Sequence, residues 1–140
     1  MDRRKFIKTS CTLCAVVAAG LPISMIASCT SLTIYKTVVS ENKIKVPLTA
    51  FVTGDFILVR PRDYEFDIAA RKLANGAYEA LLLRCTHEDN QLISTGNGFV
   101  CNLHGSRFDS EGTVVKGPAV RPLQKFRTEI VSGDLIIYST

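Results

Sequence analysis

Residues 85–106 read CTHEDNQLISTGNGFVCNLHGS, and this stretch decides the fold. Its first half carries Cys85 and His87, and its second half carries Cys101 and His104. These are the only 2 histidines in the chain, and each lies within three residues of a cysteine. Such a pairing is rare by chance, so we predict that the two halves form one metal-binding site.

Three kinds of site are compatible with these residue types. A disulfide between Cys85 and Cys101 is the simplest in an oxidising compartment, but it leaves both histidines unexplained. Structural zinc sites usually group ligands as Cys-x₂₋₄-Cys and His-x₃₋₅-His, whereas cysteine and histidine alternate within each half here. A two-iron cluster suits that order, with two cysteines on one iron and two histidines on the other. A structural zinc site without a redox role stays open as the alternative.

The segments around this stretch are short apolar runs separated by turn residues. This pattern is typical of a small antiparallel sandwich or barrel, so we predict an all-β fold for residues 29–140. Single strands are expected at Thr33–Val39, Phe56–Arg60 and Thr113–Val115. Three hairpins are expected, with runs paired around tight turns: Phe66–Leu73 with Tyr78–Cys85, Leu92–Ser94 with Phe99–Cys101, and Leu123–Val131 with Leu135–Tyr138.

The two halves of the stretch resemble the cluster-binding loops of Rieske [2Fe–2S] proteins. The resemblance runs from about residue 85 to residue 123 and implies a cluster-binding subdomain of two loops in a Rieske-type sandwich. Residues 117–123, GPAVRPL, resemble the proline loop of this family, so Gly117 and Pro118 are expected to cover the cluster. The linker between the loops is somewhat shorter than is usual. The resemblance implies one [2Fe–2S] cluster per chain with four ligands: Cys85, His87, Cys101 and His104.

Two departures from the family pattern concern the surroundings of the cluster. Rieske proteins of cytochrome bc complexes carry an extra cysteine in each loop, joined as a disulfide, and this chain has none there. We therefore expect hydrogen bonds and packing to hold the loops. Ser106 is expected to donate to a bridging sulfide, while Phe108 stands where high-potential members have a tyrosine hydroxyl. Because hydrogen bonds to sulfur stabilise the reduced cluster, this substitution favours a lower potential.

The expected function is one-electron transfer to and from a redox protein partner whose identity the sequence does not give. An oxygenase needs a second, mononuclear iron site, typically of two histidines and a carboxylate. No histidine remains for such a site. The chain is therefore expected to be an electron carrier or a subunit of a larger oxidoreductase complex rather than a stand-alone enzyme.

The first 28 residues read as an export signal. Arg3 and Arg4, followed by Lys-Phe-Ile-Lys, resemble the twin-arginine signal, and a weakly apolar segment follows. Residues 26–29, IASC, resemble a lipobox, so Cys29 is expected to be lipidated and to become the first mature residue. The apolar core is short for a spanning helix and contains Pro22, which weakens the alternative of an uncleaved anchor. Plain secretion is the third possibility. We expect a membrane-anchored lipoprotein in the periplasm or at the cell surface.

The charge distribution bears on the partner. The formal net charge is +4, and most of the basic excess falls in the first 28 residues. The remainder is nearly balanced, so we expect no nucleic-acid partner.

Overall fold

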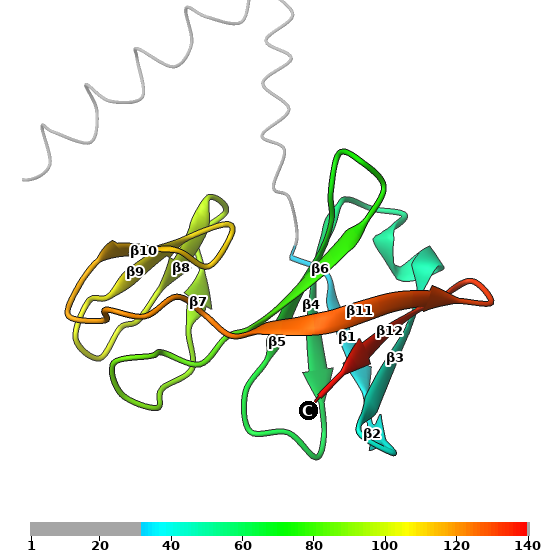
Figure 1. Cartoon of the computed structure of the whole chain (residues 1–140), viewed down its shortest axis with the longest axis horizontal. Helices are drawn as coiled ribbons and strands as arrows, with labels where there is room; N and C mark the ends of the chain where they lie inside the picture. The colour runs from blue at the N-terminus through cyan, green and yellow to red at the C-terminus, as the bar shows by residue number, and fades with distance from the viewer. Residues whose placement is uncertain (1–31, 140) are drawn as a thin grey trace, which may run out of the picture. The chain divides into compact units, whose positions relative to one another are not determined.

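The computed structural model describes residues 32–139, which form two β-sheets and contain no α-helix (Figure 1). The larger sheet has the strand order β1-β4-β5-β6-β11-β12-β3-β2, and the smaller sheet has the order β10-β9-β8-β7. A 3₁₀ turn, η1 (Leu48–Phe51), separates β3 from β4. The strand bounds are β1 Ile34–Thr37, β2 Val39–Ser40, β3 Lys43–Pro47, β4 Phe56–Pro61, β5 Ile68–Lys72, β6 Tyr78–Leu82, β7 Ile93–Ser94, β8 Gly98–Val100, β9 Arg107–Asp109, β10 Val114–Lys116, β11 Lys125–Val131 and β12 Asp134–Tyr138.

The prediction of an all-β fold is confirmed, and so are the three hairpins. Strands β5 and β6, β7 and β8, and β11 and β12 pair antiparallel as expected. The sheet is not wholly antiparallel, because β1 runs parallel to β4. This parallel pairing is possible because the chain passes through β2, β3 and η1 between the two strands, which gives a connection long enough to cross over.

The central strands of the larger sheet are buried on both faces. Successive side chains of a strand point to opposite sides. In β4, Ile57 and Val59 enter a core built from the strands of the larger sheet, whereas Leu58 enters a second core. In β5, Ile68 enters the first core and Ala69 the second. Burial on both faces explains why residues 56–60 read as a nearly uninterrupted apolar run.

The second core lies between the smaller sheet and the face of β4–β6 that points away from the first core. Leu81 of β6 packs in it with Phe99 of β8 and Phe108 of β9, all at most 4% exposed. The same core includes Cys85 and Cys101. The two cysteines are therefore placed by hydrophobic packing as well as by their loops.

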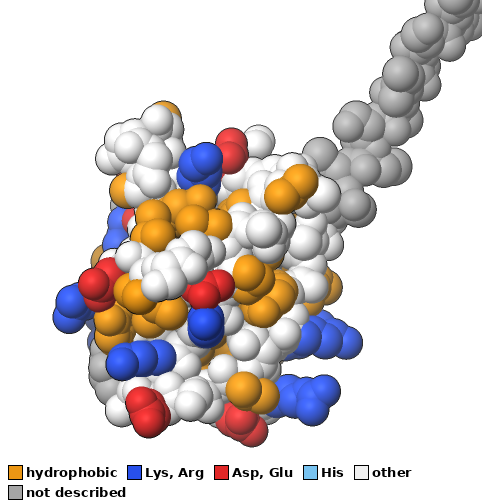
Figure 2. All heavy atoms as spheres, turned by 90° about the vertical axis from the view of Figure 1, so that its right-hand side faces the viewer, with side chains coloured by type: hydrophobic (Ala, Val, Ile, Leu, Met, Phe, Trp, Pro, Cys, Tyr) orange, Lys and Arg blue, Asp and Glu red, His pale blue; other side chains and the backbone are white. Residues whose placement is uncertain are grey.

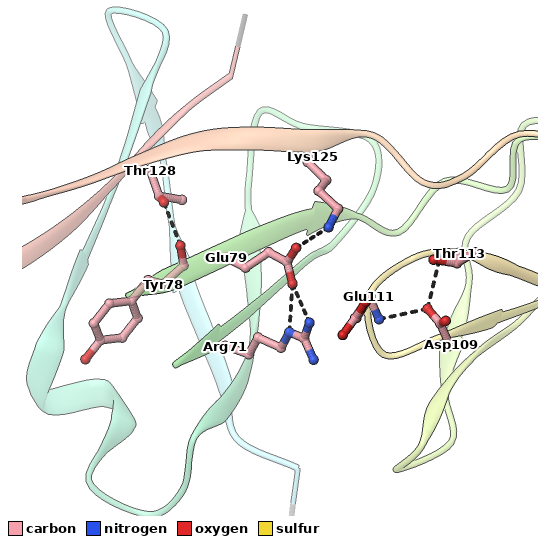
Figure 3. A network of polar contacts seen from close by, with 8 residues as sticks. All are labelled: Arg71, Tyr78, Glu79, Asp109, Glu111, Thr113, Lys125 and Thr128. Carbon is pink, nitrogen blue, oxygen red and sulfur yellow. Dashed lines mark hydrogen bonds and ion pairs between the residues drawn. The ribbon is translucent and has the colours of Figure 1, made fainter. Parts of the chain in front are cut away.

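A polar network holds the strands that lead into and out of the site (Figure 3). Glu79 of β6 accepts hydrogen bonds from Arg71 of β5 at 2.6 and 2.8 Å and pairs with Lys125 of β11. Thr128 of β11 donates to the carbonyl oxygen of Tyr78 at 2.8 Å. The network fixes β11 against β6 at a place where their ladder covers few residues.

Gly98 looks like a turn residue in the sequence, but it lies in a strand of the smaller sheet. The sequence 96–98, Gly-Asn-Gly, reads as a tight turn, but Gly98 belongs to β8. A Cβ atom on Gly98 would collide with the backbone oxygen of Phe108 in β9. Gly98 therefore permits the close approach of β8 and β9 just before Cys101.

Some predictions fall on residues that the structure does not describe. The export signal, including Arg3 and Arg4, and the lipidation site Cys29 all lie outside residues 32–139. Within that range, no helix has the length and apolar character needed to cross a bilayer.

Candidate metal centre

Loop 1, residues 83–92, leaves the end of β6 and carries the first cysteine and histidine. Two backbone hydrogen bonds close its base: Leu92 N–H donates to Leu83 O, and Cys85 N–H donates to Asn90 O, both at 2.9 Å. The Cys85 side chain points into the second core and is 1% exposed. Because the loop turns back on itself after Cys85, His87 lies exposed near its tip.

Loop 2, residues 101–106, joins β8 to β9 and carries the second pair. Cys101 N–H donates to Ser106 O at 2.8 Å, and Gly105 N–H donates to Cys101 O at 3.0 Å. Gly105 has a φ of 79°, a left-handed conformation that glycine adopts without strain. Cys101 is 1% exposed, whereas the side chain of His104 is 45% exposed.

The two loops bring the four predicted ligands together in an ordered way. Both thiols are buried, and no disulfide joins them. The imidazole rings of His87 and His104 lie edge to face, with centroids 5.1 Å apart. Neither ring is visible on the face shown in Figure 2, where charged side chains are interspersed with separate apolar ones. Because the thiols are buried and the imidazoles are exposed, sulfur lies on the inner side of the site and nitrogen on the outer side.

The hydrogen bonds around Cys101 favour its thiolate. Burial raises the pKa of the Cys101 thiol, but donors outweigh this effect and hold the pKa below its ordinary value. These donors are the backbone N–H groups of Leu103 and His104, the side-chain amide of Asn90 and the thiol of Cys85. A thiolate is the form of cysteine that binds metals. Loop 2 is therefore suited to a metal-binding cysteine.

The proline loop, residues 117–123, is attached to both other loops. Ala119 N–H donates to Ser106 Oγ at 3.0 Å, and Ser106 is fully buried. Thr86 of loop 1 donates from its hydroxyl to Arg121 O at 2.6 Å. Gly117 and Pro118 are exposed at the start of this loop.

The separation of the donor atoms bears on the kind of metal group that fits. A tetrahedral zinc ion places its nitrogen and sulfur ligands about 3.3–3.8 Å from one another. Within residues 32–139, one group of three metal-binding side chains has donor atoms that all lie within 4.8 Å of one another. The group consists of His87, Glu88 and His104 and contains neither cysteine. Two thiols on one side and two imidazoles on the other fit a two-metal group better than one ion.

Some contributors to the site were not identified from the sequence. Glu88 reads as a solvated loop residue, yet its Oε2 lies 3.4 Å from His104 Nδ1. Asn90 lies where the family's disulfide cysteine is absent and has no assigned role of its own, yet its side chain reaches loop 2. No local pattern marks either residue, because their contacts depend on how the two loops meet.

The fold and site define an all-β protein with paired cysteine–histidine loops capped by a proline loop. The sequence model of the Rieske [2Fe–2S] domain matches residues 35–127, and the chain belongs to this family. The expected cofactor, one [2Fe–2S] cluster, is confirmed by this membership.

Curated relatives agree with this assignment. The chain is 34% identical over 58 residues to the cytochrome b6-f complex iron-sulfur subunit of Chlamydomonas reinhardtii, covering 40% of this chain and 28% of that protein. It is 38% identical over 42 residues to the corresponding subunit of Microcystis aeruginosa, covering 30% and 24%. The chain thus matches about a quarter of the length of these relatives.

Two solved structures share the fold. The plasma membrane Rieske protein of Synechocystis PCC 6803 is 23% identical with a TM-score of 0.55, covering 67% of this chain and 97% of that chain. Naphthalene 1,2-dioxygenase is 18% identical with a TM-score of 0.57, covering 74% of this chain and 27% of that chain.

Proposed function

We propose that the chain is a one-electron carrier in which four side chains hold the cluster: Cys85, His87, Cys101 and His104. The observation that carries this proposal is the placement of two buried thiols and two exposed imidazoles on adjoining loops. The cluster, when bound, takes up and releases one electron. The apolar side chains packed around the thiols exclude water from the inner side, and the exposed imidazoles give a partner protein a short route to the site.

The rival function is a structural zinc site without redox activity. Among residues 32–139, no three of the four proposed ligands have donor atoms within 4.8 Å of one another, which counts against it, as does the lack of a Cys-x₂₋₄-Cys grouping. Anaerobic titration of the purified protein with a one-electron reductant separates the two functions. We expect visible absorption that bleaches with one electron per chain and returns on oxidation. A colourless protein with one zinc ion per chain would refute the proposal.

The setting of the carrier is a second part of the proposal. The curated relatives are named as subunits of cytochrome b6-f complexes, which supports a role as the electron-transfer subunit of a larger complex. A carrier that works alone is the other possibility. Affinity purification from native membranes under mild detergent distinguishes them. Stable co-purification of redox subunits supports the complex, and a free chain supports the solitary carrier.

We further propose export through the twin-arginine signal and anchoring by a lipid on Cys29. The support comes from the sequence alone, in the basic start with Arg3 and Arg4 and the lipobox ending at Cys29. Changing Arg3 and Arg4 to Lys together should trap the precursor in the cytoplasm. Cys29→Ser should release the protein from the membrane or leave it unprocessed. If Cys29→Ser alters neither processing nor membrane association, an uncleaved anchor replaces the lipid.

A further inference from the structure

Two side chains of loop 1 outside the proposed ligand set contact loop 2, Glu88 and Asn90, and Asn90 is the one that reaches a sulfur atom. Asn90 lies at the base of loop 1 and is partly buried. Its Nδ2 lies 3.0 Å from Asn102 Oδ1 and 3.5 Å from Cys101 Sγ, both in loop 2. The same nitrogen lies 3.2 Å from the backbone oxygen of Gln91. Asn90 therefore contacts both the frame of loop 2 and one of its sulfur atoms.

The surroundings of the Asn90 amide fix which of its two ends faces the sulfur. A backbone carbonyl oxygen can only accept a hydrogen bond, so the group facing Gln91 O must be the NH₂ group. The sulfur of Cys101 lies on the same side of the amide, within hydrogen-bond distance of this nitrogen. A metal-bound cysteine is a thiolate and accepts hydrogen bonds. The two N–H groups of the amide are thus shared among Gln91 O, Asn102 Oδ1 and Cys101 Sγ, and the reverse arrangement, with the amide oxygen facing Gln91 O, is excluded.

The backbone of Asn90 adds to this arrangement. Its carbonyl oxygen accepts the hydrogen bond from Cys85 N–H at 2.9 Å that closes loop 1. The backbone of Asn90 is therefore tied to one cysteine and its side chain to the other. Because its backbone bonds to Cys85 and its side chain contacts Cys101, Asn90 can keep the two thiols at a fixed separation without a covalent bond between the loops.

Resting on the proposed ligand set, we propose that Asn90 is a positioning residue with two separable roles. Through Asn102 it braces loop 2 against loop 1 and slows loss of the cluster. Through Cys101 Sγ it donates a hydrogen bond that stabilises the added negative charge of the reduced state and raises the reduction potential.

Two variants separate these roles in the cluster-loaded protein. Asn90→Ala removes both contacts, whereas Asn102→Ala removes the brace and leaves the donor near Cys101. Asn97→Ala is the matched control, because Asn97 is exposed on the turn between β7 and β8. The measurements are the reduction potential by voltammetry and the rate at which visible absorption is lost in excess chelator.

We expect Asn90→Ala to lower the potential and to speed cluster loss several-fold. Asn102→Ala should speed cluster loss and leave the potential close to that of the parent protein, and Asn97→Ala should change neither. If Asn102→Ala lowers the potential as much as Asn90→Ala, the hydrogen bond to sulfur is refuted. If Asn90→Ala changes neither quantity, the whole inference is refuted.

A further variant covers the case in which Asn90→Ala does not fold. Asn90→Asp keeps the shape of the side chain but replaces the donor with a negatively charged acceptor beside the sulfur. It should lower the potential below that of the parent protein, and an unchanged potential contradicts the inference. The proposed ligand set fails in a different way: the parent protein itself would then show no reversible one-electron bleaching. The two failures are thus distinguishable.

Discussion

The hydroxyl of Ser106 should affect both the stability of the site and its potential, and Ser106→Ala tests both. Ser106 Oγ accepts the hydrogen bond from Ala119 N–H at 3.0 Å. Because its oxygen serves as the acceptor, the hydroxyl hydrogen is free to donate in another direction. We predict that this hydrogen is directed to a cluster sulfur, as the resemblance to Rieske proteins implies.

The size of the stability effect follows from the burial of both partners. Ser106 is fully buried and Ala119 is 3% exposed, so water cannot readily replace the lost oxygen. A buried N–H group left without an acceptor costs about 1–3 kcal/mol. With a urea m-value of about 2 kcal/mol/M, a loss of about 2 kcal/mol moves the unfolding midpoint down by about 1 M. Other hydrogen bonds of the proline loop, such as Leu123 N–H to Gly112 O at 2.8 Å, stay in place.

The assay compares three proteins loaded with the cluster: the parent, Ser106→Ala and Ser110→Ala. Ser110 is exposed in the turn after β9, so Ser110→Ala controls for the loss of a serine hydroxyl away from the site. Ser106→Ala should show a lower urea midpoint and a lower reduction potential, and Ser110→Ala should show neither. An unchanged midpoint would refute the role of Ser106 in holding the proline loop. A lower midpoint with an unchanged potential would refute donation to the cluster.

Two other changes probe the surroundings of the site. Phe108→Tyr should raise the reduction potential by adding a hydroxyl donor near the cluster, and voltammetry that shows no increase would count against this placement of the ring. Burial raises the pKa of Glu79, but Lys125 and Arg71 outweigh it and hold the pKa below its ordinary value. The ionised carboxylate therefore stabilises the fold fully above an unfolded pKa of about 4.3, and this contribution is lost as the pH falls through the lower folded value. Glu79→Gln should have a lower urea midpoint at pH 6 and a smaller loss of midpoint between pH 6 and pH 3 than the parent, whereas parallel pH curves would contradict the assigned ion pairs.

The sequence predicts the parts of this molecule that depend on local patterns. The hairpin around Asn75-Gly76 follows from turn chemistry, and Gly76 has the expected left-handed φ of 83°. The strand Lys43–Pro47 was missed, although its alternation of exposed lysines with buried Ile44 and Val46 is a period-two signal. The short strand Arg107–Asp109 has one apolar residue, Phe108, so no strand pattern marks it in the sequence.

Other features could not be found from local patterns at all. The parallel pairing of β1 with β4 joins segments separated by two strands and a 3₁₀ turn. It is settled by packing over the whole sheet rather than by the residues of either strand. The bonds from Asn90 to loop 2 and from Ala119 to Ser106 also join distant segments. For the site, the sequence indicates the proposed ligands but not the side chains that connect the three loops.

The central claim is that both histidines and both cysteines hold one cluster, and the histidine half has a direct test. The chain contains 2 histidines, so incorporation of ¹⁵N-histidine labels His87 and His104 and no other residue. Pulsed paramagnetic resonance of the reduced, labelled protein should show two strongly coupled ¹⁵N nuclei, and the unlabelled protein should show two ¹⁴N nuclei instead. A spectrum with one coupled histidine nitrogen, or with none, would contradict the claim.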